Sequence, residues 1–418
     1  MKLPILVAAL WCVSASAPAE TIAIVHAKAW TLTGDTAVED ATIVITDGKI
    51  ASVSAGASAP VGARVIDAGG KPVTPGLMHP STRLGLIEVS SANETVDHAA
   101  KASAPGAGFD VQYAINANST LIDLARADGV TRALSYPSSS GTPPFAGSAT
   151  LLRLFENGEM VEQPHAAVVV TIGNRSAMAT VGSRSAQWQL LRTALDTAKT
   201  PAATPPATGQ RTPDALALES VINGKAPLAI ITHRESDLRQ AIKLASDYRI
   251  RVVILGGAEA WRIADQLAAV KIPVIVDPMS NLPSSFDELG ARIDNAALLR
   301  KAGVTVAMSL DGVQSYNAGL SIREGAGLAV ANGLSYVDGL RSIISAPAEI
   351  WGVADRFGTL SVGKDGDLVI WDGDPLEPSS APSAVFIQGK EVSLVTRQTE
   401  LRDRYLPLIQ KARAAGRP

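Results

Sequence analysis

Residues 226–278 read APLAIITHRESDLRQAIKLASDYRIRVVILGGAEAWRIADQLAAVKIPVIVDP. Short apolar runs alternate in this stretch with longer segments whose apolar residues recur at helical spacing, for example Leu238, Ile242 and Ala245. The apolar runs are 227–232, 251–255 and 272–276. Continuous apolar runs separated by amphipathic helices are typical of parallel strands that are buried on both faces. The segment therefore predicts repeated strand–helix units.

The same alternation continues on both sides of this segment. Five further apolar runs lie at 77–84, 130–136, 149–154, 166–172 and 304–310. Eight short strands with intervening helices favour an α/β fold with a (β/α)8 TIM barrel over residues 76–357. An open doubly wound sheet is the alternative. No glycine-rich phosphate loop follows the first run, so nucleotide binding is not expected.

The two ends of the chain show a different sequence pattern. Residues 20–75 form short alternating segments broken by turn residues such as Asp47 and Gly48, which adopt the positive φ angles of a tight hairpin. The same pattern returns in residues 358–395, and neither piece is large enough to make a core alone. We therefore expect both ends to pair into one small composite β-sandwich. Residues 396–418 predict a C-terminal helix.

The first 19 residues predict a secretory signal peptide. Lys2 precedes an apolar run, and the small residues Ala17 and Ala19 mark a cleavage site. The apolar run is too short to span roughly 30 Å of hydrocarbon, so no membrane span is expected. The chain is therefore predicted to be exported, to the periplasm or by secretion. Cys12 is the only cysteine, so cleavage would leave no thiol for catalysis, disulfides or metal binding.

Composition and charge narrow the class of partner. Hydrophobic residues make up 46% of the chain, which excludes a disordered protein. The 37 Lys and Arg against 40 Asp and Glu give a formal net charge of −3, without the basic patch that nucleic acid requires. We expect a small-molecule substrate or ligand and no nucleic acid. Homo- or hetero-oligomeric assembly stays open.

Two stretches carry a resemblance to a known family. They are VTPGLMHPSTRLGLIEV at 73–89 and SAPAEIWGVADRFGTLSVGKDGDLVIWDGDPL at 345–376. Both resemble the amidohydrolase superfamily, closest to its imidazolonepropionase-like and exported dipeptidase-like branches. The resemblance implies a TIM barrel whose mouth holds one or two divalent metals, usually zinc. It also implies hydrolysis of the C–N bonds of amides, cyclic ureides or dipeptides by metal-bound water.

The resemblance places five site positions in this sequence. The family's first-strand His-x-His pair falls on Ser81 and Arg83, and its sixth-strand histidine position holds Gly256, so these ligands are replaced. His233 matches the fifth-strand ligand. Asp311 matches the eighth-strand residue that is both metal ligand and catalytic general base. These matches predict a degenerate metal site, with one zinc or other divalent ion bound weakly or not at all.

Arg83 suggests what replaces the metal. Strands one and eight are neighbours in a closed barrel, so we expect Arg83 to pair with Asp311 across the mouth. His79 is expected to be a core residue because it lies too deep for a ligand. His98 lies in a polar loop and is a less favoured substitute ligand.

Two functions remain in competition. The first is hydrolysis of C–N bonds in small amide, cyclic or dipeptide substrates with a degenerate metal site. The second is a non-catalytic protein of amidohydrolase fold that binds a ligand or serves as a partner subunit. A serine nucleophile at Ser81 or Ser309 is disfavoured because no G-x-S-x-G motif accompanies it.

Overall fold

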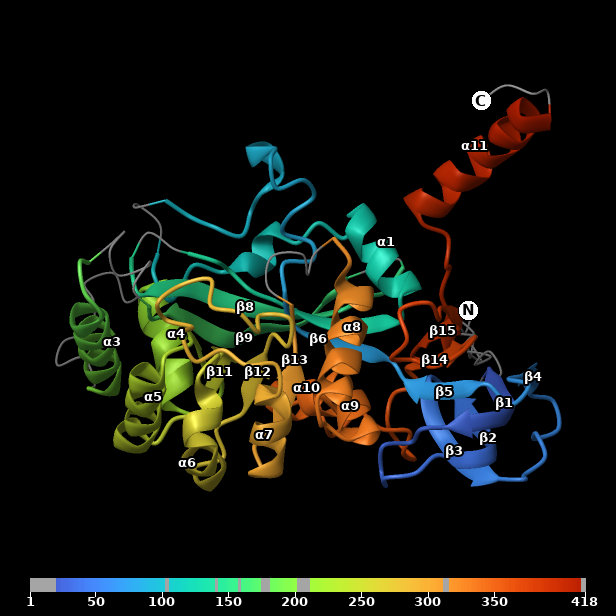
Figure 1. Cartoon of the computed structure of the whole chain (residues 1–418), viewed down its shortest axis with the longest axis horizontal. Coiled ribbons are helices and arrows are strands. Elements are labelled where there is room, and N and C mark those ends of the chain that lie inside the picture. The colour runs from blue at the N-terminus through green and yellow to red at the C-terminus, as the bar shows by residue number, and fades with distance from the viewer. Residues whose placement is uncertain are drawn as a thin grey trace, which may run out of the picture.

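A computed structural model describes residues 20–101, 105–139, 142–156, 159–173, 181–200, 211–310 and 316–414. Figure 1 shows a strand barrel surrounded by helices, a smaller all-β part beside it and a projecting C-terminal helix. The predicted signal peptide, residues 1–19, lies outside the described residues.

The barrel sheet has eight strands in the order β13-β12-β11-β10-β9-β8-β7-β6. They are β6 (Leu77–Thr82), β7 (Val130–Ser135), β8 (Phe145–Arg153), β9 (Val161–Thr171), β10 (Leu228–Thr232), β11 (Val252–Gly256), β12 (Val274–Val276) and β13 (Val306–Met308). The first and last strands meet at a seam where the Ser81 and Ser309 hydroxyls are 2.9 Å apart. The predicted α/β TIM barrel is confirmed.

One strand departs from a regular (β/α)8 pattern. β8 runs antiparallel to both β7 and β9, whereas the other neighbouring strands pair in parallel. A parallel connection needs a crossover of a dozen or more residues. The connections 136–144 and 154–160 are shorter than that and hold no helix in their described residues. The third strand therefore reverses direction, which the pattern of apolar runs did not reveal.

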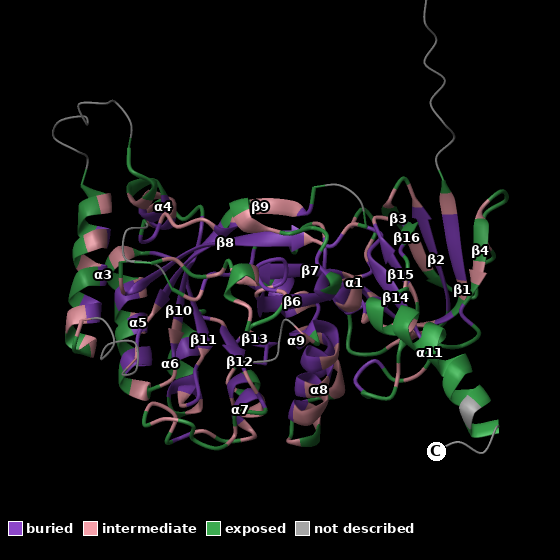
Figure 2. Cartoon of the chain, turned by 90° about the horizontal axis from the view of Figure 1, so that it is seen from above, coloured by how far each residue is buried: buried purple, intermediate pink, exposed green. Residues whose placement is uncertain are grey.

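Strand alternation divides the barrel core into two layers. In β10, Leu228 and Ile230 belong to the apolar cluster shared with the helices, whereas Ala229 and Ile231 belong to the cluster inside the barrel. Figure 2 shows the strands buried between their neighbours. The helices of this part are η1 (Asn93–Thr95), η2 (Val111–Ala114), α1 (Thr120–Ala127), α3 (Arg184–Lys199), α4 (Pro213–Ile222), α5 (Glu235–Tyr248), η3 (Ala260–Ile263), α6 (Ala264–Ala269), α7 (Asn295–Lys301), α8 (Ala318–Ala331), α9 (Tyr336–Ser342) and α10 (Ser345–Ile350).

The amino end of the barrel is closed by the segment that follows α9. Ile350, Trp351, Val353 and Phe357 are all buried in the interior cluster. The Trp351 indole also donates a hydrogen bond of 2.8 Å to the carbonyl of Pro80 in β6. These side chains therefore fill the barrel interior at its amino end.

The second sheet combines strands from both ends of the chain. Its order is β16-β15-β14-β5-β1-β2-β3, with β4 paired to β1. The strands are β1 (Thr21–Ala29), β2 (Val38–Thr46), β3 (Lys49–Ala55), β4 (Arg64–Asp67), β5 (Pro72–Pro75), β14 (Leu368–Trp371), β15 (Pro382–Ile387) and β16 (Lys390–Glu391). Asp47 and Gly48 form the β2–β3 turn with φ of +51° and +73°, as their sequence predicts.

Charged side chains fix this sheet to the amino end of the barrel. The basal ion cluster comprises Arg132, Arg153, Glu162, Asp365 and Asp367. Arg132 is fully buried and contacts all three carboxylates, at 2.8 Å to Glu162, 2.5 Å to Asp365 and in a shorter contact to Asp367. Its two aspartates lie beside β14, so the cluster joins the two sheets.

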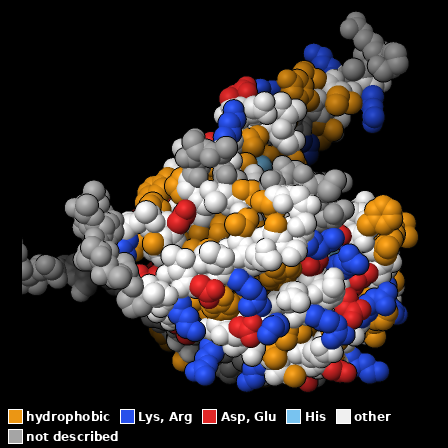
Figure 3. All heavy atoms as spheres, turned by 90° about the vertical axis from the view of Figure 1, so that its left-hand side faces the viewer, with side chains coloured by type: hydrophobic (Ala, Val, Ile, Leu, Met, Phe, Trp, Pro, Cys, Tyr) orange, Lys and Arg blue, Asp and Glu red, His pale blue; other side chains and the backbone are white. Residues whose placement is uncertain are grey.

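The C-terminal helix α11 (Arg397–Ala414) projects from the rest of the chain (Figure 1). Its described side chains are exposed apart from Thr399, which is half-buried (Figure 2). None of the helices described is both long and apolar enough to cross a membrane. On the face shown in Figure 3, basic and acidic side chains are interspersed without a field of one sign.

Candidate functional site

His233 and Gly256 meet at the barrel mouth. His233 follows β10 directly, and Gly256 is the last residue of β11. Gly256 has a φ of +100°, and a Cβ placed there would lie 2.5 Å from Cε1 of His233. The imidazole therefore packs against the backbone of Gly256 and occupies the space that a side chain at this position would fill. A side chain at position 256 would therefore require the His233 imidazole to move.

Glu288 is the acidic neighbour of His233. Its Oε1 lies 3.9 Å from Nδ1 of the imidazole, whose side chain is 23% exposed. Its Oε2 accepts hydrogen bonds from the Ser284 amide, at 3.0 Å, and hydroxyl, at 2.7 Å. Together with Asp277, these residues line a cavity of about 110 Å³. The arrangement places a carboxylate that is held by two hydrogen bonds beside the imidazole.

The seam serines are held by each other. The Ser81 hydroxyl donates to Oγ of Ser309, and the Ser309 hydroxyl donates to the Ser81 carbonyl at 3.1 Å. Both hydroxyl protons are therefore used within the barrel wall, and both residues are only 5% exposed. A hydroxyl in this state is not activated by a neighbouring base, as nucleophilic catalysis requires.

Arg83 lies at the mouth just beyond β6. Its guanidinium carbon is 5.6 Å from the centre of the Tyr136 ring. His98, from the loop after β6, hydrogen-bonds Ser138 at 2.8 Å. Partial burial, together with the charge of Arg83, lowers the pKa of His98. Asp311 lies outside the described residues, so its catalytic role and its pairing with Arg83 stay predictions.

The donors in the described part of the chain do not complete a zinc site. Tetrahedral zinc needs at least three protein ligands. Among the described residues, no group of three or more His, Cys, Asp or Glu side chains could hold a metal. Ser81 and Gly256 offer no ligand nitrogen. His79 is fully buried, and burial lowers its pKa to about 3, in keeping with its predicted core position.

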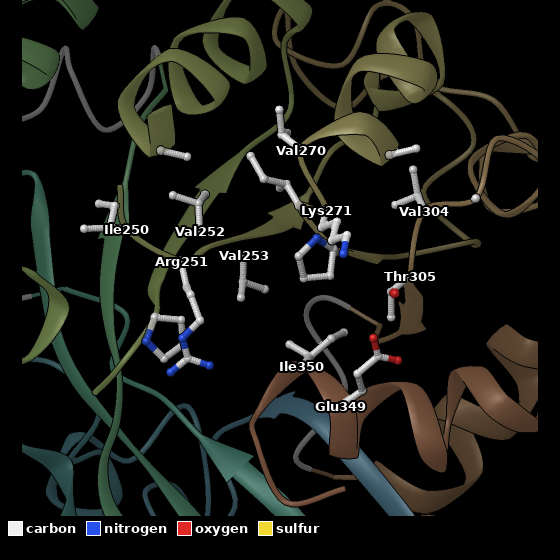
Figure 4. Close-up of a pocket in the computed structure, with 16 residues that line it drawn as sticks. Ile250, Arg251, Val252, Val253, Val270, Lys271, Val304, Thr305, Glu349 and Ile350 are labelled. Carbon is white, nitrogen blue, oxygen red and sulfur yellow. The ribbon is translucent and has the colours of Figure 1, made fainter. Parts of the chain in front are cut away.

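A larger cavity, of about 640 Å³, lies at the opposite end of the barrel (Figure 4). Its wall includes the segments that precede β11, β12 and β13, with Arg251, Lys271 and Glu349 among apolar side chains. Functional groups of TIM barrels gather instead at the carboxyl ends of the strands. We therefore place the candidate site at the mouth, around His233.

Sequence reasoning identified His233 and Gly256, considered His98 as a less favoured ligand, and missed Glu288 and Tyr136. Glu288 lies in the polar segment between β12 and α7, which shows neither a periodic pattern nor a motif. Tyr136 ends an apolar run and was counted only as part of a strand. The signal that could have found it is the position of an aromatic residue at a strand's carboxyl end, where barrel sites form.

Sequence comparisons point to one family. Residues 229–395 match the amidohydrolase family. A stretch of 57 residues is 44% identical to "Amidohydrolase tasK" of Hapsidospora irregularis, covering 14% of this chain. That match spans only 6% of the length of the relative.

Solved structures share the fold. An amidohydrolase from Thermotoga maritima is similar with a TM-score of 0.80 at 24% identity, over 89% of this chain and 99% of that one. Molinate hydrolase has a TM-score of 0.56 at 17% identity, over 91% and 96%. An adenosine deaminase from Xanthomonas campestris with bound zinc has a TM-score of 0.51 at 18% identity, over 95% and 99%.

Proposed function

We propose that this chain, whose residues 229–395 match the amidohydrolase family, hydrolyses C–N bonds of small amide, cyclic or dipeptide substrates at a degenerate metal site. The observation that carries the proposal is the His233 imidazole, held at the mouth against Gly256 and beside Glu288. His233 is the imidazole that this arrangement offers to a substrate.

His233 would act as a general base and then as a general acid. The imidazole takes a proton from water as the water oxygen bonds to the substrate carbonyl carbon. It returns that proton to the nitrogen when the C–N bond breaks. Glu288, whose Oε1 lies 3.9 Å from Nδ1, faces the imidazole during this transfer. Glu288 is itself held by two hydrogen bonds from Ser284, so its position does not depend on the substrate.

The expected rate is low. Zinc lowers the pKa of bound water from about 15.7 to about 7, a gain of roughly eight powers of ten in hydroxide at neutral pH. General acid–base catalysis contributes only about 10²–10⁴. We therefore expect slow turnover, best with cyclic or otherwise activated C–N bonds.

The test is a hydrolysis screen with and without a chelator. N-acyl amino acids, dipeptides and cyclic ureides would be incubated with the purified chain, and released amine would be measured. We expect slow turnover that the chelator leaves unchanged and that His233→Ala abolishes. His26→Ala is the matched control because His26 is an exposed histidine on β1. Chelator-sensitive turnover with stoichiometric zinc, or full activity in His233→Ala, would refute this mechanism.

A second candidate is a non-catalytic binding or partner subunit. The observation that favours it is the Ser81–Ser309 hydrogen bond, which uses for wall structure a position where the family has a metal ligand. In this case the same screen would show no amine release, and calorimetric titration with the same compounds would show binding. We also propose export of the chain on the basis of residues 1–19, which cell fractionation would test.

A further inference from the structure

Arg83 directs its charge toward the interior of the barrel mouth. It follows the last residue of β6 and stacks over Tyr136, just beyond the end of β7. The Tyr136 side chain is 4% exposed and belongs to the apolar cluster that fills the barrel. A guanidinium that covers this ring therefore lies over the interior and not on the outer wall.

This cation lacks a partner of opposite charge among the described residues. Arg83 is half-buried, its Nε is inaccessible to solvent, and that Nε makes no hydrogen bond. None of the ion pairs within the described part of the chain includes it. An unpaired, partly desolvated charge is costly, and buried charges are normally paired.

Other buried arginines of the chain are neutralised or saturated. Arg132 contacts three carboxylates. Arg323 is 1% exposed and donates to the carbonyls of Pro375, Glu377 and Ser380. Arg126, Arg153 and Arg356 also leave Nε without a hydrogen bond, but each of them is paired with a carboxylate. Among the described residues, Arg83 therefore differs in lacking a carboxylate partner, and not in its bare Nε.

The nearby polar groups do not fill this role. The hydroxyls of Ser81 and Ser309 donate their hydrogen bonds to each other's residue within the seam. His98 is bonded to Ser138 and carries no negative charge. Among the described residues no acceptor for Arg83 remains, so its acceptor is either Asp311, which lies outside them, or a bound molecule. The titration below distinguishes these two cases.

We propose that Arg83 binds the carboxylate of a small ligand in the barrel mouth, with Tyr136 supporting the face of the guanidinium. The planar fork of Arg matches a carboxylate in two parallel hydrogen bonds. The inference rests on the proposed function and narrows its ligands to N-acyl amino acids and to dipeptides with a free C-terminal carboxylate. A residue type that cannot ligate a metal would here hold the acid end of the ligand.

Calorimetric titration of the full chain with two matched probes tests the proposal. N-acetyl-L-leucine carries a carboxylate, whereas N-acetyl-L-leucinamide has nearly the same shape without charge. We expect the acid to bind at least about tenfold tighter, as for hydrogen bonds to charged groups. The difference should shrink at high salt. Arg83→Met should remove it, and Arg83→Lys should restore part of it.

Arg192→Met is the matched control. Arg192 is also half-buried and lies 5.9 Å from the ring of Tyr248, but it is paired with Asp247 on the helical exterior. This variant should keep the wild-type preference for the acid. Equal affinity of the wild type for acid and amide, or an unchanged preference in Arg83→Met, would overturn the proposal. If Arg83→Met fails to fold by circular dichroism, Arg83→Lys and the salt dependence of the wild type decide.

The binding readout separates this inference from the proposed hydrolysis. A chain that prefers the acid through Arg83 but releases no amine refutes hydrolysis and supports the carboxylate site. A chain that hydrolyses both probe classes equally well, with equal affinity, supports hydrolysis and refutes the carboxylate site.

Discussion

Replacing Arg132 by methionine is expected to lower the melting temperature by about 4–6 °C. The buried guanidinium contacts Glu162, Asp365 and Asp367 and lies 4.3 Å from the ring of Phe357. Methionine keeps much of the apolar volume but leaves the carboxylates short of one cation. Removing one partner of a buried pair costs about 3–5 kcal/mol. An unfolding entropy of about 2.1 cal/mol/K per residue, over roughly 400 residues, converts this cost into the stated shift.

Differential scanning calorimetry of the purified variant is the assay. Arg341→Met is the matched control because Arg341 in α9 also contacts the all-β part, through Asp35 at 2.8 Å. That pair is exposed, with Asp35 at 79%, so its loss should cost less than about 1 kcal/mol. The loss of an exposed ion pair would change the melting temperature by less than about 1 °C. A shift that small in Arg132→Met would refute the reasoning. So would an equal shift in Arg341→Met.

Three further outcomes are expected. Gly256→Ala should lower the melting temperature more than Gly303→Ala and should shift the His233 NMR signals. Both glycines have a positive φ, but only a Cβ at position 256 would contact a side chain. Equal melting temperatures of the two variants would contradict this. Burial raises the pKa of Glu162, but neighbouring cations outweigh it and hold the pKa below its usual value. Its stabilisation is therefore present above the unfolded-state pKa and is lost as pH falls through the lower folded value. Glu162→Gln should accordingly be less stable than the wild type at pH 7 in urea unfolding, with a difference that narrows below about pH 4; a constant difference would be inconsistent with linkage. Truncation of the chain before Arg397, which removes α11, should leave the melting temperature within about 1 °C of the wild type, because this helix is largely exposed. A fall of several degrees would show that α11 packs against the rest of the protein.

The sequence pattern predicted the barrel well because buried parallel strands leave a strong local signal. Runs such as 227–232 are apolar on both faces, and the helices between them have clear amphipathic spacing. His233 could be placed at a strand end for the same reason. The direction of β8 was missed because strand direction depends on connection length and on pairing, not on the composition of the strand itself.

The environment of the site could not be predicted in the same way. Glu288 reaches His233 through the fold of a long polar segment, in which no residue type or spacing marks the contact. The stacking of Arg83 on Tyr136 joins residues more than fifty positions apart. Such contacts depend on where two neighbouring strands end in space, and a single sequence carries no direct record of that distance.

The reversal of β8 also determines at which end of the barrel its first and last residues lie. Arg153 ends this strand and, because of the reversal, emerges among Asp365 and Glu162 of the basal ion cluster. A strand of the usual polarity would have delivered the same side chain to the opposite opening. A mutational survey along β8 should consequently show an inverted gradient: changes near Phe145 would disturb ligand handling, whereas changes near Arg153 would loosen the anchorage of the all-β part.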